Sequence, residues 1–146
     1  MKYSTKVSDA VHTLVLIYLS DNQPLSSTDI SVSIKTNPAY IRQLMAKLKT
    51  AGLLQSTRGQ ANPSLTRPPK QITLLDVYRA MEGNKPLLHQ DTHTNPECGI
   101  GVNVQLALRD CFDQVQHRAE MEMQSITLQE VIERYQEKIS LLVKDE

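Results

Sequence analysis

The chain has 146 residues, no net formal charge at pH 7 and two cysteines. This length suffices for one domain with a substantial hydrophobic core, or for a small domain with an appended element. Two cysteines do not make the disulfide framework of a small secreted protein, and no apolar run approaches the ~18 residues of a membrane-spanning helix. The opening residues carry no apolar signal core, so we expect a cytoplasmic protein without a membrane partner.

The zero net charge is the sum of two opposed halves. Residues 1–80 hold ten Lys and Arg against four Asp and Glu, whereas residues 81–146 hold six against twelve. The span 30–75 contains no acidic residue. A solvated surface normally mixes both signs, so this span indicates a phosphate-binding surface, and the acidic half is expected to face away from it. Seven basic residues lie in the span: Lys35, Arg42, Lys47, Lys49, Arg58, Arg67 and Lys70.

A first helix is predicted from a cap at Ser4 or Thr5 to about Leu19, and residues 21–24 then turn the chain. One side of this helix is apolar throughout, as expected of a helix that packs on a core. Its apolar residues are Val7, Val11, Leu14, Val15, Tyr18 and Leu19.

The stretch 26–51 predicts two short helices joined by a tight turn. Ser26 and Asp29 have the spacing of a capping box, and Asn37 followed by Pro38 opens the second helix. Periodicity alone fits a buried helical hairpin as well as a helix-turn-helix, but the basic charge favours a helix that enters the major groove of DNA. The apolar stripe of the second helix is Ile41, Leu44, Met45 and Leu48, and its polar side is Tyr40, Arg42, Gln43, Lys47 and Lys49.

A β-hairpin is predicted directly after this helix. Gly52 ends the helix, residues 53–57 and 64–67 read as strands, and Pro68-Pro69 closes the hairpin. An ordinary surface hairpin would have the same pattern, but the position after a recognition helix predicts the wing of a winged-helix domain. Wings lie on the sugar–phosphate backbone or probe the minor groove. The wing residues expected at DNA are Arg58, Gln60 and Arg67.

The second half of the chain predicts three helices and a linker. A short helix 74–82 has a capping box at Thr73 and Asp76, and a polar stretch with two prolines follows it. A helix from about Val102 to Ser125 carries an apolar stripe too long for a small domain to cover, so we expect a homodimer that reads a palindromic operator. The last helix opens with a capping box at Thr127 and Glu130 and carries the apolar residues Leu128, Val131, Ile132, Tyr135 and Ile139. The expected organisation is a winged helix-turn-helix domain at 1–83, a linker or sensor loop at 84–101 and a helical dimerisation region at 102–146, in a mainly α chain with a small β-hairpin wing.

These segments together resemble the Rrf-two family of bacterial winged-helix regulators, whose members control iron–sulfur assembly, the nitric-oxide response and cysteine metabolism. The resemblance implies a DNA-binding homodimer crossed at the long helix, usually a repressor tuned by a small signal. The matching stretches, in chain order, are MKYSTKVSDAVHTL, residues 26–30, Asn37 to Arg42, Leu48 to Gly52, Arg58-Gly59, Arg67 to Pro69, Ile72 to Val77, Glu82-Gly83 and residues 125–130.

Two departures from the family pattern narrow the resemblance. The wing turn of many members is Gly-Gly-Tyr, whereas residues 60–65 here read QANPSL, which predicts a stiffer wing. Members that bind an iron–sulfur cluster carry three closely spaced cysteines before the long helix, but only Cys98 stands there in this chain. Residues 95–101 instead match the Asn-Pro-x-Cys-x-Ile-Gly pattern of the cluster-less, YwnA-like branch, so no cofactor and no metal are expected.

Cys98 has three interpretations. As a thiol just before a helix N-terminus it suits a redox or electrophile switch that alters DNA binding. An iron–sulfur cluster would need more ligands than Cys98 and Cys111 supply, and a zinc site with His89 and His93 lacks the spacing of a known finger. Cys111 lies on the apolar stripe of the long helix, where a packed thiol is the ordinary role, although a disulfide with its symmetry mate or with Cys98 stays open.

The sequence therefore predicts a dimeric transcription regulator, most simply a repressor. No phosphate loop, nucleophile triad or paired-carboxylate motif indicates an enzyme. A ligand- or metal-responsive regulator and an adaptor that uses the long helix without binding DNA are the alternatives. The residues expected to contact DNA are Asn37, Pro38, Ala39, Tyr40, Arg42, Gln43, Lys47, Arg58, Gln60 and Arg67, and Cys98, with Cys111 as a second candidate, is the expected redox sensor.

Overall fold

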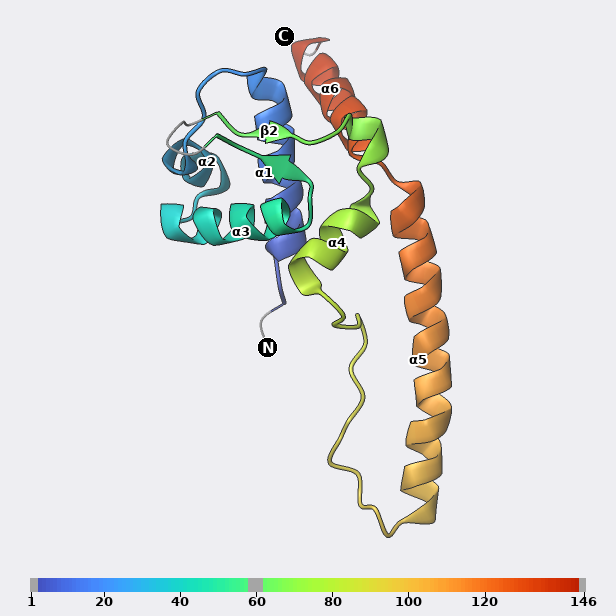
Figure 1. The fold of residues 1–146 in the computed structure, drawn as a ribbon. Helices are drawn as coiled ribbons and strands as arrows, with labels where there is room; N and C mark the ends of the chain where they lie inside the picture. The colour runs from blue at the N-terminus through green and yellow to red at the C-terminus, as the bar shows by residue number, and fades with distance from the viewer. Residues whose placement is uncertain (1–2, 58–61, 145–146) are drawn as a thin grey trace.

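A computed structural model describes residues 3–57 and 62–144 of the chain. The described part is helical apart from one short hairpin (Figure 1). None of its helices is long and apolar enough to cross a bilayer. The elements are α1 (Lys6–Ser20), α2 (Ser27–Ile34), α3 (Pro38–Thr50), β1 (Leu54–Gln55), β2 (Ser64–Leu65), the 3₁₀ turn η1 (Pro69–Gln71), α4 (Leu74–Glu82), α5 (Gly99–Ser125) and α6 (Leu128–Lys144).

The predicted pair of helices is α2 and α3, and side-chain caps define both of their starts. The Ser26 hydroxyl accepts from the amide of Asp29 at 3.1 Å, and the Asp29 carboxylate accepts from the amide of Ser26 at 2.9 Å. The Asn37 side chain accepts from the amide of Tyr40 at 2.8 Å. Between the helices Lys35 adopts a left-handed conformation with φ of 62°, which turns the chain sharply enough to bring α3 across α2. The predicted helix-turn-helix is confirmed.

The end of α3 sets where the hairpin begins. Gly52 has φ of +77°, and the amide of Leu53 donates to the carbonyl of Leu48 at 3.0 Å, as in a Schellman C-cap. Strand β1 then starts at Leu54 and pairs antiparallel with β2. The strands have two residues each, fewer than predicted. Just beyond them the amide of Thr66 donates to the carbonyl of Leu53 at 3.3 Å, and the Thr66 hydroxyl donates to the Gly52 carbonyl at 2.6 Å.

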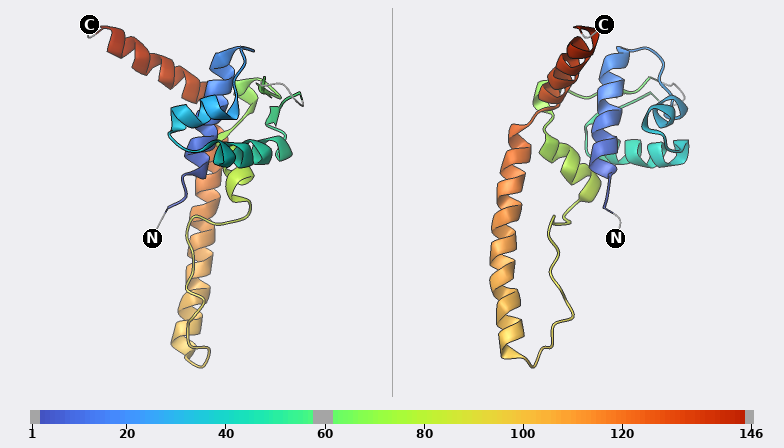
Figure 2. Two further views of the ribbon diagram at one scale, coloured as in Figure 1. Left: turned by 90° about the vertical axis from the view of Figure 1, so that its left-hand side faces the viewer. Right: turned by 180° about the vertical axis from the view of Figure 1, so that it is seen from behind.

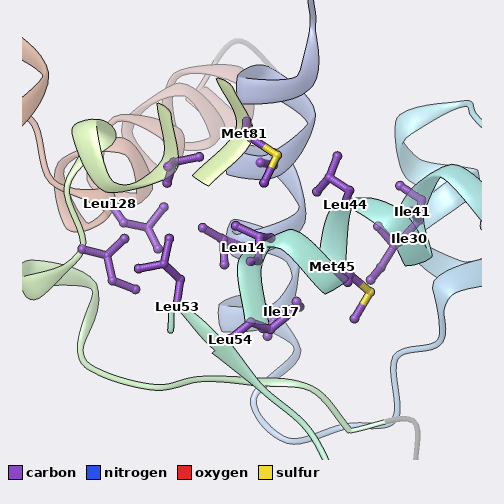
Figure 3. Close-up of a cluster of buried hydrophobic side chains, with 14 of the residues drawn as sticks. Leu14, Ile17, Ile30, Ile41, Leu44, Met45, Leu53, Leu54, Met81 and Leu128 are labelled. Atoms are coloured by element: carbon purple, nitrogen blue, oxygen red, sulfur yellow. The ribbon is translucent and has the colours of Figure 1, made fainter. Parts of the chain in front are cut away.

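One hydrophobic core joins α1, α2, α3, α4 and the beginning of α6 (Figure 3). Leu14 of α1 and Ile41 of α3 are fully buried in it, and Leu128 and Ile132 of α6 are nearly so. Backbone hydrogen bonds fasten α6 in place, since the amide of Leu128 donates to the carbonyl of Ile72 at 2.8 Å. The last helix of the expected region 102–146 therefore shares the core of residues 1–83.

Residues 84–125, which we call the arm, project from this core (Figures 1 and 2). The arm consists of α5 and the irregular segment that runs beside it. Helix α5 has 27 residues, none of them buried, and at about 1.5 Å per residue it is roughly 40 Å long. It begins at Gly99 rather than near Val102, because the sulfur of Cys98 caps it by accepting from the amide of Gly101 at 3.4 Å.

Candidate nucleic-acid interface

The exposed side of α3 carries most of the residues that the sequence assigns to DNA. Its buried stripe fixes the helix on the core, so the opposite side must face solvent. A nonpolar inner side with amide and guanidinium groups outside is the chemistry that reads base edges in a major groove. The exposed residues of this side are Asn37, Ala39, Arg42, Gln43 and Lys47, with Lys49 at the last turn.

Tyr40 is placed differently from its neighbours on α3. The side chain is half-buried against the core, and its hydroxyl donates to the Asp9 carboxylate of α1 at 2.8 Å. Burial, and then the hydrogen bond and charge of Asp9, raise the pKa of Tyr40 to about 12. The phenol is therefore neutral at physiological pH and remains the donor in this bond. Pro38 is half-buried as well, in keeping with its place in the first turn of the helix.

Two carboxylates lie beside the N-terminal end of α3, although the span 30–75 contains none. Asp9 of α1 and Glu82 of α4 line an open depression of about 520 Å³ together with Tyr40. Glu82 accepts a hydrogen bond from the Ser4 hydroxyl at 2.7 Å. These residues are 31 and 42 positions away from Tyr40, so no local pattern could have shown that they adjoin it. The other lining residues are Tyr3, Ser4, Thr5, Lys6, Thr36, Asn37 and Lys85.

Arg67 stands at the base of the wing with its guanidinium turned inward. It donates to the carbonyl of Gln71 at 2.7 Å and forms an ion pair with Asp76 at 3.0 Å, while a weaker contact of 3.5 Å reaches the carbonyl of Gly52. Asp76 is also the capping residue of α4, because it accepts from the amide of Thr73 at 2.9 Å. Arg67 thus joins the end of α3, the wing and the start of α4.

The remaining wing residues assigned to DNA, Arg58 and Gln60, lie outside the described residues. In the described part of the wing, β1 contacts α3 and β2 contacts α1. Near the wing tip Asn62 is exposed, whereas Pro63 is buried against the domain. The hairpin predicted after α3 is confirmed, and its contacts with DNA remain a prediction.

The predicted sensor residue, Cys98, is the N-cap of α5. The N-terminal end of α5 is the end of the arm farthest from the core (Figures 1 and 2). Cys98 and Cys111 are both exposed and both free thiols. Thirteen residues separate them, which corresponds to about 20 Å along a helix, so they cannot pair with each other inside one chain. His93 is exposed and lies 3.6 Å from the Asp91 carboxylate.

The described residues do not fit a metal centre within one chain. An iron–sulfur cluster takes thiolate or imidazole ligands, commonly three or four from the protein. Nowhere in residues 3–57 and 62–144 do three His, Cys, Asp or Glu side chains gather closely enough to hold an ion. Cys98, whose sulfur accepts from the backbone amide of Gly101, does not by itself supply such a set.

Comparison with known proteins gives consistent matches over nearly the whole chain. Residues 3–134 match the Rrf2 family, described as "Iron-dependent Transcriptional regulator". The chain is 36% identical over 129 residues to YwnA of Bacillus subtilis (strain 168), named as an HTH-type transcriptional regulator, over 88% of this chain and 96% of that protein. IscR of T. potens superposes with a TM-score of 0.69 at 26% identity, over 94% of this chain and 90% of the other. A solved structure named as that of a DNA-binding protein gives a TM-score of 0.72 at 35% identity, over 87% and 98% of the two chains.

These matches confirm the predicted fold class, a mainly helical chain with a small hairpin wing. They also agree with the resemblance to a YwnA-like branch that the residues before α5 indicate. The iron in the family description has no group of three ligands to hold it among the described residues of this chain.

Proposed function

Because the chain belongs to the Rrf2 (Rrf-two) family of transcriptional regulators, we propose that it is a dimeric repressor that binds a palindromic operator through α3. The observation that carries this proposal is the exposed polar side of α3, held outward by a fully nonpolar buried stripe. A DNA-binding regulator works at the chromosome, so a cytoplasmic location goes with this proposal.

The proposal divides the DNA contacts between bases and backbone. Arg42 and Gln43 have the donors and acceptors that pair with guanine and adenine edges, so they are assigned to base reading. Asn37 and Ala39 at the helix start and Lys47 farther along are assigned to the adjoining backbone and groove edge. Arg58 and Gln60 of the wing are proposed to reach the next groove, and Arg67 to support the wing from its base.

The proposed dimer forms through α5, which has an apolar stripe that its own chain leaves partly uncovered. Val104 and Val115 of this stripe are each about half exposed, at 49% and 48%. Contiguous exposed apolar surface of this kind marks an interface. A second copy that crosses α5 along the stripe would bury it and place two α3 helices on one face of the duplex, as a palindrome requires. The other members of the stripe are half-buried: Leu108, Phe112, Ala119 and Met123.

We further propose that a thiol reaction at Cys98 controls DNA binding. The sulfur is exposed, and it caps α5 through the amide of Gly101. Oxidation or alkylation would remove that cap and alter the first turn of the helix that carries the dimer stripe. Cys111, exposed on α5, is the second candidate. A regulator that responds to a small ligand or to a metal is the alternative, and it would leave DNA binding indifferent to thiol reagents.

The testing experiment is a titration of reduced, metal-free protein with a duplex that it selects from a random pool. We expect tight binding that weakens steeply with salt, because phosphate contacts release counterions. Treatment with hypochlorite or a quinone is expected to release the duplex. DNA binding that is unchanged by the treatment would contradict the thiol switch but would still agree with a DNA-binding regulator. A flat salt response would instead favour an adaptor that does not use DNA.

A further inference from the structure

A negatively charged side chain lies directly against the proposed DNA-reading helix. Asp9, in the first turn of α1, receives the Tyr40 hydroxyl at 2.8 Å and the Thr5 hydroxyl at 3.2 Å on the same carboxylate oxygen. Asp9 and Tyr40 are both half-buried. A carboxylate so near DNA phosphates opposes binding through its charge, so its place beside α3 calls for a structural explanation.

Tyr40 is held at three points, and these make it a fixed element of the first turn of α3. Its amide donates to the Asn37 side chain at 2.8 Å, and its hydroxyl donates to Asp9. Its ring packs on the core. A side chain held by its backbone, its ring and its hydroxyl is not free to follow a base edge, in contrast with the exposed Arg42 and Gln43 that come two and three residues later.

We propose that Asp9 is a positioning residue for operator recognition. It fixes Tyr40 and thereby orients the side chains of Arg42 and Gln43 toward the bases. This inference rests on the proposed function of α3. Recognition requires the reading side chains to be held within about 0.5 Å of their productive geometry. The bond from α1 to the first turn of α3 restrains the rotation of that turn about the helix axis. Asp9 and Tyr40 thus act on specificity without contacting a base.

The test compares three single variants, the double variant Tyr40→Phe/Asp9→Ala and one control by their affinity for the selected duplex and for a random duplex of equal length. Tyr40→Phe removes only the hydroxyl, Asp9→Ala removes the acceptor, and Asp9→Asn keeps an acceptor oxygen without the charge. We expect Tyr40→Phe and Asp9→Ala each to lose about fivefold to tenfold in affinity for the selected duplex, since tenfold is 1.4 kcal/mol. Random-duplex affinity should change less than about twofold. The double variant should lose no more than either single one, because both remove the same bond.

Glu82→Gln is the matched control, because Glu82 lines the same depression but bonds Ser4 instead of Tyr40. It is expected to keep the preference for the selected duplex, as Asp9→Asn is. If Asp9→Asn, Asp9→Ala and Glu82→Gln all raise affinity for both duplexes alike, Asp9 is only a repelling charge and the inference is wrong. Equal losses on both duplexes with a lowered melting temperature would make the pair merely structural and overturn it too. If the wild-type protein shows no preference for any duplex, the proposed function itself is wrong.

Discussion

The side-chain amide of Gln116 on α5 donates a hydrogen bond of 3.2 Å to the buried hydroxyl of Tyr78 on α4. The other atom of the same amide, Oε1, accepts from the backbone of Leu87 at 2.9 Å, and the Tyr78 hydroxyl itself donates to the carbonyl of Lys85 at 2.7 Å. One glutamine therefore connects α5, α4 and the segment between them. Figure 1 shows how α4 and α5 lie where the arm leaves the core.

Replacing Gln116 with Ala should loosen the base of the arm. Two hydrogen bonds are lost, each contributing roughly 0.5–1.5 kcal/mol to stability, and the Leu87 amide loses its partner. We expect faster amide hydrogen exchange at Leu87, with the exchange of α1 unchanged. Gln114→Ala, at an exposed position of the same helix, is the control. Unchanged protection of Leu87 in the Gln116 variant would show that the junction does not restrain the arm.

The anchoring of α6 gives a prediction about stability. Ile132 is 1% exposed and packs in the core with Leu128, whereas Ile139 farther along the same helix is 41% exposed. Ile132→Ala leaves a cavity and should lower the free energy of unfolding by about 2–5 kcal/mol. Ile139→Ala should cost much less in the monomeric state. Denaturant titration measures both. Equal small effects would mean that α6 is not part of the core.

The helices were predictable from sequence because their signals are local. Ser26 with Asp29, Asn37 with Pro38, and the four-residue stripe of α3 each lie within one or two turns, and the structure has them as expected. The neighbours of the proposed interface were not predictable in this way. Asp9 reaches Tyr40 only because α1 packs across α3, a relation that no spacing in the sequence encodes.

The inward orientation of the Arg67 side chain could not be predicted from the sequence, for a related reason. A basic residue beside a predicted wing suggests phosphate contact, but its position nine residues before Asp76 becomes an ion pair only when the chain folds through η1. The packing of α6 on the core could not be predicted either, because its apolar side is equally suited to a dimer interface. In both cases the residue type was informative and its partner was set by packing between distant segments.

Replacing Arg42 should weaken specific DNA binding more than non-specific DNA binding. It is exposed on α3, and a bidentate guanidinium–guanine contact discriminates by about 1–3 kcal/mol. Arg42→Ala is therefore expected to weaken the selected duplex about tenfold or more and to leave the random duplex nearly unchanged. Lys47→Ala, as a backbone contact, should weaken both alike. An equal loss on both duplexes for Arg42→Ala would reassign Arg42 to the phosphates.

Arg67 should instead matter for stability. Its guanidinium has a carboxylate and a carbonyl partner at the base of the wing, with about one third of the side chain exposed. Partial exposure limits the contribution of the ion pair, so Arg67→Ala is expected to cost about 1 kcal/mol. Arg67→Lys should recover little of this, because lysine cannot reproduce the forked geometry. A variant as stable as the wild type, with weaker binding to every duplex, would return Arg67 to the DNA surface.

Cys98→Ser tests the proposed thiol switch at the cysteine that caps α5. Serine can still cap α5, since its oxygen accepts from the Gly101 amide as the sulfur now does at 3.4 Å, so folding and DNA binding should stay close to wild type. The hydroxyl does not react with mild oxidants as a thiol does, so hypochlorite or quinone should no longer release the selected duplex.

Cys111→Ser is the matched control, because Cys111 is equally free and exposed within one chain. If α5 pairs as proposed, the dimer partner covers the apolar stripe that includes this position, and reagents should reach Cys98 first. Loss of the response only in the Cys98 variant would therefore support both the switch and the pairing. Release of DNA by oxidant from Cys98→Ser but not from Cys111→Ser would move the sensor into the dimer interface, where a disulfide between two copies becomes the simplest chemistry.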